Sequence, residues 1–247
     1  MKVSIITVVY NNESFIEDCI NSVLGQSYSN VEYIIIDGCS TDGTLEKILR
    51  HSDRIAKIIS EPDDGIYDAM NKGIALATGE IVGILNADDF YVDVDVLNKI
   101  AGIFEDKSID ASYSDVEYVK RHKVNDVVRR WHSGHFERKR FYFGWSPPHP
   151  TFFVRKSVYE KYGLYDPSLK ISADYEMMLR VLFVKKITCH YFQQVIIKMR
   201  DGGVSNKSLK NRVQANTEDR KAWQINNVRP KPYTLSLKPL RKVIQFF

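Results

Sequence analysis

The stretch IVGILNADD, residues 81–89, joins a continuous apolar run directly to two adjacent carboxylates. Such a run is typical of a buried parallel strand, and open α/β sheets bind their ligands beyond the carboxyl ends of such strands. Two neighbouring negative charges are unfavourable unless a cation or hydrogen-bond donors neutralise them. We therefore predict that Asp88 and Asp89 bind a divalent metal, Mg²⁺ or Mn²⁺. The alternative is an exposed Asp-Asp turn that caps the next helix.

Apolar runs alternate with helical stretches on both sides of this strand. The runs cover residues 3–9, 31–36, 55–59 and 80–85, and the helical stretches cover residues 13–24, 42–49, 66–77 and 94–104. This βαβα rhythm predicts a mostly parallel sheet with helices on both faces. Asn11 and Asn12 are expected to cap the first helix.

After about Asp106 the sequence becomes more aromatic and richer in strands. We expect these strands at residues 111–119, 127–131, 151–154 and 187–199. Between them, residues 143–150 contain three prolines, which favour an extended and fairly rigid loop. The second half is therefore predicted to be a smaller, mixed part of the same fold.

Composition and cysteine usage restrict the class of protein. With 247 residues, 44% hydrophobic and 27% charged, the chain resembles an ordinary globular protein with a large core. The apolar run near the N-terminus is too short for a signal peptide or a membrane span. Cys19, Cys39 and Cys189 form no C-x-x-C pair, so neither a disulfide framework nor a zinc ribbon is expected. A reducing, cytoplasmic location fits this cysteine usage.

The net charge of +4 is distributed unevenly along the chain. Residues 205–247 contain ten Lys and Arg against Glu218 and Asp219, so this segment carries about +8 and the preceding body about −4. A basic segment suits an anionic surface, either nucleic acid or anionic lipid. Since its end is also rich in Phe, peripheral contact with the inner face of a membrane is one expectation. A solvated helix with a disordered end is the alternative.

Acidic residues follow successive predicted strands: Asp37, then Asp63 and Asp64, then Asp88 and Asp89. The carboxyl ends of parallel strands meet at one edge of a sheet, so these side chains should line a common cleft. The first strand–helix connection has no glycine-rich fingerprint, which argues against a dehydrogenase and an ATPase. A sugar nucleotidyltransferase is less favoured for the same reason.

Four segments in this order resemble the family 2 glycosyltransferases with a GT-A fold. They are TVVYNN at residues 7–12, IDGCSTDGT at 36–44, NKGIALATGE at 71–80 and LNADD at 85–89. The resemblance extends over roughly residues 2–191. Each segment is weak evidence alone, but their order and spacing are specific.

The resemblance implies roles for residues that would bind the donor. Thr7 and Tyr10 would bracket the nucleobase, and Asp37 would accept a hydrogen bond from the imide of uracil. The donor is therefore expected to be a UDP-sugar. Lys72 would lie near the phosphates, where a point charge is suitable. The alternative for Lys72 is a solvated helix lysine.

In the family's Asp-x-Asp motif the last aspartate binds the metal and the first tends to contact the ribose. Here Asn86 replaces the first aspartate, which retains a possible ribose hydrogen bond and removes one charge. The resemblance therefore makes Asp88 the first metal ligand and Asp89 a supporting one.

The resemblance also implies a catalytic base in the second half. Asp174 matches the aspartate of the family's Glu-Asp motif, with Ala173 in place of the glutamate. It would open a helix, where the dipole favours a carboxylate, and a simple N-cap is the alternative. Glu176 is the substitute candidate if Asp174 fails.

Two further residues are candidate substrate contacts. His149 lies between two prolines and would make a metal-proximal or acceptor contact, or be a structural histidine. Trp145 would stack on a sugar ring or pack against the body. The glycine-rich residues 202–205 would form a mobile loop over the site.

These assignments predict an inverting single displacement from a nucleotide-diphosphate sugar to a saccharide or polyprenyl-diphosphate-linked acceptor, as in bacterial polysaccharide biosynthesis. Residues 1–105 would bind the nucleotide sugar and residues 106–205 the acceptor, with residues 206–247 forming a basic helix and tail. The rival functions are a sugar nucleotidyltransferase and a non-catalytic sugar- or nucleotide-binding protein, and no nucleic-acid partner is expected.

Overall fold

The computed structural model describes residues 1–202 and 209–238. Its strands are β1 (Val3–Val9), β2 (Val31–Asp37), β3 (Lys57–Ser60), β4 (Ile81–Ile84), β5 (Phe90–Tyr91), β6 (Ala111–Lys120), β7 (Lys123–Trp131), β8 (Phe153–Arg155) and β9 (Cys189–Arg200). Its α-helices are α1 (Ile16–Leu24), α2 (Thr44–Leu49), α3 (Ile66–Leu76), α4 (Val96–Ile103), α5 (Lys156–Tyr162), α6 (Ala173–Met178) and α7 (Leu209–Ile225). Short 3₁₀ or π turns are η1 (Arg138–Phe143), η2 (His149–Thr151) and η3 (Leu179–Val184).

The first half of the chain forms the parallel part of the sheet. The strands lie in the order β3-β2-β1-β4, and every neighbouring pair among them is parallel. β1 is central and buried along its whole length because helices cover both of its faces. Ile6 and Val8 pack with the cluster that includes α3, whereas Val3, Ile5 and Val9 pack with the cluster that includes α1. Alternate side chains point to opposite faces, which explains why the strand is apolar throughout.

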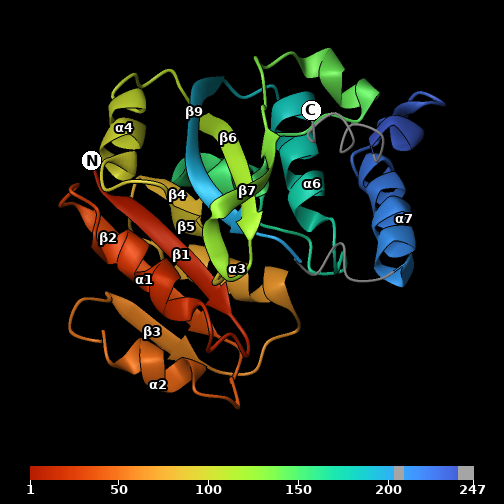
Figure 1. Ribbon diagram of the computed structural model, residues 1–247. Helices are drawn as coiled ribbons and strands as arrows, with labels where there is room; N and C mark the ends of the chain where they lie inside the picture. The colour runs from red at the N-terminus through yellow and green to blue at the C-terminus, as the bar shows by residue number, and fades with distance from the viewer. Residues whose placement is uncertain (203–208, 239–247) are drawn as a thin grey trace.

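The second half continues the same sheet with mixed pairing. β8 is antiparallel to both β4 and β6, β6 is parallel to β9, and β7 pairs with β6 as a hairpin. Figure 1 shows β6 and β9 side by side near the centre of the molecule, with α4 on one side and α7 at the opposite margin. The predicted α/β class, with a parallel first half and a mixed second half, is confirmed.

Helix α7 packs against α6 through buried contacts. Trp223 is fully buried, and its Nε1 donates to the hydroxyl of Tyr175 at 3.0 Å. The indole also stacks on Tyr142, with ring centroids 5.5 Å apart. The basic C-terminal helix is therefore part of the fold, and it supports the helix that carries Asp174.

Two local expectations were wrong. Asn11 and Asn12 do not cap α1, whose N-cap is Phe15 without a side-chain hydrogen bond. The proline-rich segment is not extended throughout, because η2 forms a 3₁₀ turn with Pro150 near its start. Proline is compatible with a first helical turn because it lacks only an N–H that has no partner there.

Candidate active site

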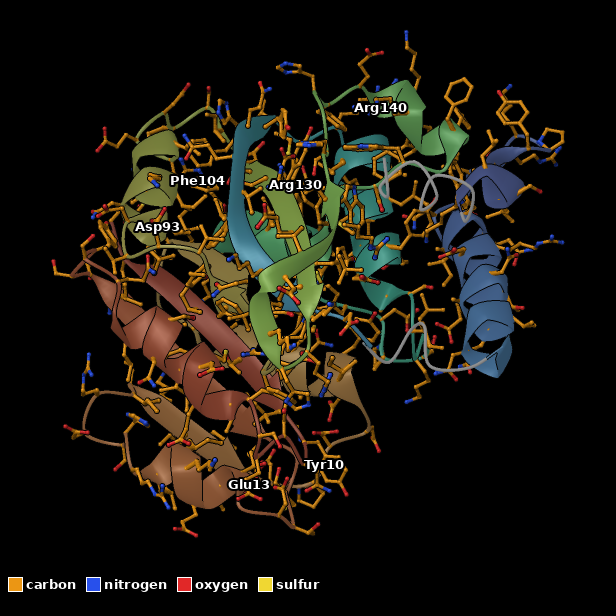
Figure 2. All side chains as sticks on the ribbon, in the orientation of Figure 1. Tyr10, Glu13, Asp93, Phe104, Arg130 and Arg140 are labelled. Carbon is orange, nitrogen blue, oxygen red and sulfur yellow. The ribbon has the colours of Figure 1, made fainter. Side chains whose placement is uncertain are left out.

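The edge at the carboxyl ends of β1 to β4 gathers the predicted donor-binding residues. β2 and β4 both flank β1, so the segments that follow these strands emerge at the same edge. Asp37 pairs in register with Val9, the residue before Tyr10. Figure 2 shows Tyr10 and Glu13 close together at this edge. The predicted convergence of the strand ends is therefore present.

Tyr10 offers an open aromatic face in this region. Its side chain is 63% exposed. Gly38 lies beside it, because a Cβ there would come within 3.5 Å of the tyrosine ring and 2.5 Å of Asp63 Oδ2. Only glycine allows this close approach, and it brings the half-buried Asp63 carboxylate next to Tyr10.

Asp37 is fully buried and its carboxylate is used within the protein. It accepts hydrogen bonds from the backbone N–H of Ser40, at 3.1 Å, and from the hydroxyl of Ser60, at 2.6 Å. These bonds fix the turn after β2 and tie it to the end of β3. The expected direct contact with a nucleobase does not fit a side chain without exposed surface.

Thr7 is placed in the core rather than at the edge. Its hydroxyl is fully buried and accepts a hydrogen bond from Tyr33 at 3.0 Å. Cys19 Sγ lies 3.6 Å away, and burial raises the pKa of that thiol to about 12. The Thr7 side chain therefore faces α1 and has no exposed surface with which to contact a nucleobase.

The two adjacent aspartates after β4 differ in environment. The Asp88 side chain is 25% exposed, and one of its oxygens lies 3.5 Å from Arg121 Nη1. Asp89 is buried and accepts a hydrogen bond from Asn86 Nδ2 at 2.9 Å. Burial raises the pKa of Asp89 well above its usual value, and the charge of Asp88 adds to this effect. Two adjacent negative charges are therefore disfavoured here, although the guanidinium group of Arg121 lies beside Asp88.

The donor set fits a hard divalent cation that the substrate helps to hold. Among residues 1–202 and 209–238, no group of three or more Asp, Glu, His or Cys side chains is placed to hold a metal unaided. Mg²⁺ is usually bound by one or two carboxylates together with substrate phosphates. Asp88 is the accessible carboxylate for such an ion, and Asp89 supports it from below the surface.

Arg200, which the sequence did not single out, fixes the acidic turn. Its side chain is 2% exposed and donates from Nη1 to the carbonyl of Asp88 at 2.8 Å. It also pairs with Asp18 and lies 4.8 Å from the ring centroids of Phe15 and Phe90. An arginine at the end of the apolar strand β9 was the available signal, because arginine is seldom buried without a partner.

Asp174 lies in the first turn of α6 and is held by two neutral donors. Its Oδ1 accepts from the hydroxyl of Tyr67 at 3.0 Å and from the backbone N–H of Tyr175 at 2.8 Å. The described residues donate no hydrogen bond to Oδ2, and the side chain is half-buried. Ser172 is the N-cap residue, so Asp174 is not the simple N-cap that was the alternative.

Tyr67 brings Asp174 to the edge shared with the donor-binding residues. It lies in the first turn of α3, directly after the segment that follows β3, and its hydroxyl also contacts the carbonyl of Ile171 at 2.8 Å. Lys170 adds a second link by donating to the carbonyl of Asp64 at 2.8 Å. Burial raises the pKa of Tyr67 well above its usual value, so the phenol stays protonated.

Glu218 positions the segment that leads to Asp174 and was not identified from the sequence. Its carboxylate accepts from three consecutive backbone N–H groups of residues 170–172, at 2.8–3.1 Å, and from Gln214. This buried side chain lies on α7, so the basic helix contributes an acid to the site. Its partners are 46–48 residues away in sequence, which explains why no local pattern revealed it.

Glu176, the substitute for Asp174, has a structural role. It is 1% exposed, forms two hydrogen bonds with Arg180 at 3.0 Å, and accepts from Asn226 at 2.9 Å. A side chain with these partners is not available to a substrate.

His149 begins the turn η2 and is half-buried. Its Nε2 is 2.8 Å from the hydroxyl of Tyr165, whose ring packs on that of Tyr67 at 5.7 Å. Burial lowers the pKa of His149, and the charge of Asp174 opposes this shift. The structure therefore connects His149 with the Asp174 side of the site.

Lys72 and Trp145 both have partners within the protein. Lys72 Nζ lies 2.9 Å from Glu61 and 3.3 Å from Asp68, and these carboxylates raise its pKa. Trp145 is 3% exposed and donates from Nε1 to the carbonyl of Ser133 at 2.8 Å. The indole ring packs among neighbouring aromatic rings, which corresponds to the alternative that Trp145 packs against the body.

Two expectations concern segments outside the described part of the chain. Most of the predicted loop at 202–205 and the end of the chain from residue 239 lie there. Within the described residues, no helix has the length and apolar character needed to cross a bilayer.

Comparison with known proteins identifies relatives of this chain. The model of Glycosyl transferase family 2 matches residues 4–163. A PGL/p-HBAD biosynthesis glycosyltransferase of Mycobacterium bovis is 29% identical over 208 residues, covering 82% of this chain and 78% of the relative. An uncharacterized glycosyltransferase of Mycobacterium tuberculosis is 32% identical over 184 residues, covering 74% and 69%.

Solved structures share the fold. TarS 1-349 of S. aureus superposes with a TM-score of 0.72 at 18% identity, covering 99% of this chain and 72% of that one. The mannosyltransferase PcManGT of Pyrobaculum calidifontis, solved with GDP-Man and Mn²⁺, has a TM-score of 0.68 at 20% identity, covering 96% and 68%. These similarities establish the GT-A architecture.

The family match spans most of the chain and includes the strand ends that carry Tyr10, Asp37 and Asp88. The protein is therefore a nucleotide-sugar glycosyltransferase that belongs to glycosyl transferase family 2.

Proposed function

We propose that this protein transfers a sugar from a UDP-sugar to a saccharide or lipid-linked acceptor, with inversion at the anomeric carbon and with Asp174 as the base. The observation that carries the proposal is the geometry of Asp174. Its Oδ1 is fixed by Tyr67 and Tyr175 while the described residues leave Oδ2 without a donor. A carboxylate held in this way can accept a proton from an acceptor hydroxyl.

The nucleobase would stack on Tyr10, whose ring is mostly exposed. Asp63 is the reachable carboxylate beside this ring, so we assign to it the hydrogen bond from the uracil imide. Asp37 would act indirectly, by fixing the turn that carries Gly38. A uridine donor is supported by the similar fold of TarS, which has been solved with UDP-GlcNAc.

Asp88 and Asp89 would hold Mg²⁺ or Mn²⁺ together with the donor diphosphate, and Asn86 would contact the ribose. The bound ion would neutralise negative charge on the departing diphosphate. Arg121, 3.5 Å from Asp88, would add a second positive charge to the same leaving group. Lys72 remains paired with its two carboxylates and has no part in this proposal.

Tyr67 would hold the base both before and after proton transfer. Its single phenolic proton has two acceptors within reach, Asp174 Oδ1 at 3.0 Å and the carbonyl of Ile171 at 2.8 Å. It donates to Asp174 while that carboxylate is ionised. Once Asp174 carries the acceptor's proton on Oδ2, the phenol can donate to the carbonyl instead, so the side chain stays in place.

The acceptor is the less defined substrate. The relative from Mycobacterium bovis is named for PGL/p-HBAD biosynthesis, which supports an acceptor made during cell-envelope assembly. Because the chain belongs to a family of glycosyl transferases, a glycosyltransferase is favoured over the two rival functions, a nucleotidyltransferase and a non-catalytic binding protein.

A panel of nucleotide sugars tests the proposal. Each would be incubated with the protein and Mn²⁺, and release of the free nucleoside diphosphate would be measured with and without EDTA. We expect UDP release from at least one UDP-sugar, dependent on metal and absent in the Asp174→Asn variant. Release of pyrophosphate, or turnover in Asp174→Asn equal to that of the wild type, would contradict it.

A further inference from the structure

An exposed aromatic pair lies far along the chain from the donor-binding edge. Phe143, at the end of η1, is 45% exposed, and Tyr233 is 42% exposed. Their rings stack with centroids 5.6 Å apart and an interplanar angle of 25°. Single exposed apolar residues are common on proteins, but two large rings that stack on each other form a local apolar platform.

Cations lie near the rings of Phe183 and Tyr142, and Tyr142 directly precedes Phe143 in the chain. Arg138 and Lys231 are exposed, and each lies 5.6 Å from the centroid of a neighbouring ring, that of Phe183 and that of Tyr142. The side chain of Lys139 is 76% exposed and pairs with Glu137 at 3.1 Å.

An open hollow of about 410 Å³ lies beside Tyr142, the neighbour of Phe143 in sequence, and has two of these cations in its wall. It is lined by Glu137, Arg138, Lys139, Tyr142 and Phe183. We call Arg138, Lys139, Phe143, Lys231 and Tyr233 the aromatic–basic face.

Two segments that are distant in sequence, residues 142–144 and 234–238, are in direct contact at this face. The hydroxyl of Thr234 donates to the carbonyl of Tyr142 at 2.7 Å. Gly144 has φ of 72°, and the backbone of Lys238 occupies the space that a side chain would need there. The cations and rings are therefore presented by a fixed backbone, so their arrangement does not depend on an ordering step.

The chain continues from this face with a sequence of the same character. Lys238 is the last described residue, and residues 239–247 read PLRKVIQFF. This segment contains two cations and two phenylalanines and has no acidic residue. In composition, this segment therefore resembles the aromatic–basic face.

We propose that the aromatic–basic face docks the protein on an anionic membrane surface. Lys and Arg near anionic headgroups are attracted to them, and Tyr and Phe rings lie favourably at the level of the headgroups. Arg138 in the wall of this hollow has the charge to receive a headgroup phosphate, whereas Lys139 is paired there with Glu137. The docking is independent of the chemistry proposed above, although it suits a lipid-linked acceptor.

Vesicle flotation tests this inference. The full chain is mixed with vesicles of phosphatidylcholine alone or with phosphatidylglycerol, at low and high salt. We expect flotation only with phosphatidylglycerol, and its loss near 1 M salt, where the Debye length is about 3 Å. Each cation removed should weaken binding roughly fivefold, so Arg138→Gln/Lys139→Gln/Lys231→Gln should lose about 100-fold.

The matched control is Lys2→Gln/Arg50→Gln/Lys107→Gln, which removes three exposed cations elsewhere on the molecule. It should float like the wild type. A second variant, Phe143→Ser/Tyr233→Ser, keeps the charge and should also bind less tightly. UDP binding and thermal melting of each variant show whether the fold is intact.

Several outcomes overturn the inference. They are wild-type flotation of the face variant, equal loss in the control, and failure of the wild type to bind anionic vesicles at low salt. Tighter binding to an RNA oligonucleotide than to vesicles would also contradict it. Truncation after residue 238 separates the face from the tail: if the truncated chain loses all binding while the face variant keeps it, the tail alone is responsible.

Discussion

The two carboxylate sites at the edge of the sheet are held in opposite ways. At Asp88 and Asp89, two negative charges meet guanidinium groups, and one acid is buried deeply enough that its pKa is raised. At Asp174, a phenol and a backbone amide hold a single carboxylate, and no cation donates to it among the described residues. The first arrangement suits binding of charge, and the second suits acceptance of a proton. In the proposed function, leaving-group stabilisation and nucleophile activation are therefore separate tasks.

The largest expected effect comes from removing the proton acceptor. Asp174→Asn preserves the shape of the side chain, and its loss as a general base should lower kcat by about 10³-fold. UDP affinity should stay within about twofold, because the donor-binding residues are unchanged. Steady-state kinetics and calorimetric titration with UDP measure the two quantities. A parallel loss of UDP affinity would show that the two sites are not separate.

The converse change is Asp88→Ala. Removal of the accessible carboxylate should weaken UDP binding in the presence of Mn²⁺ by about tenfold or more, equivalent to roughly 1.4 kcal/mol. Binding in EDTA should change little, since the metal contribution is then absent in both proteins. Calorimetric titration of UDP with Mn²⁺ and with EDTA measures this difference. An equal loss under both conditions would mean that Asp88 does not act through a metal.

Tyr67→Phe tests the contribution of the phenol that donates to Asp174. A hydrogen bond to a charged group contributes about 1.5–3 kcal/mol, so kcat should fall by roughly tenfold or more while UDP affinity is kept. Steady-state kinetics measures kcat, and calorimetric titration measures the affinity for UDP.

Tyr159→Phe is the matched control for this change. Its hydroxyl contacts that of Tyr165 at 3.3 Å and is buried, but it does not contact Asp174. This variant should keep the wild-type kcat. An unchanged kcat in Tyr67→Phe, or the same fall in both variants, would show that Tyr67 does not position the base.

A smaller effect is expected from Glu218→Gln. The uncharged amide keeps one acceptor oxygen for three backbone N–H groups, so the free energy of unfolding should fall by about 1–3 kcal/mol. Because the affected segment leads to Asp174 and not to Asp88, kcat should fall more than UDP affinity. Urea unfolding and steady-state kinetics check both, and a loss confined to UDP binding would be inconsistent with this placement.

The sequence predicts the donor half well because its signals are local. The strand at residues 3–9 and the helix beginning at Ile66 are found at the expected positions, since apolar periodicity and turn residues act over a few residues. The acids after β2, β3 and β4 were located by the same reasoning. Parallel topology then places these strand ends at one edge.

The rest depends on contacts between residues far apart in sequence. Tyr67 and Asp174 are separated by 107 residues, and Arg200 and Asp88 by 112. Sequence pattern alone does not reveal which face of an element is covered. The side chains of Thr7 and Trp145, for example, point into the core.

The most direct test of the separation of tasks is a crystal structure of the protein with UDP and Mn²⁺. We expect Asp88 to contact the ion together with the diphosphate. We also expect Asp174 to remain hydrogen-bonded to Tyr67, with Oδ2 directed toward the open side of the same edge. An ion bound by Asp174, or a diphosphate bound away from Asp88, would contradict it.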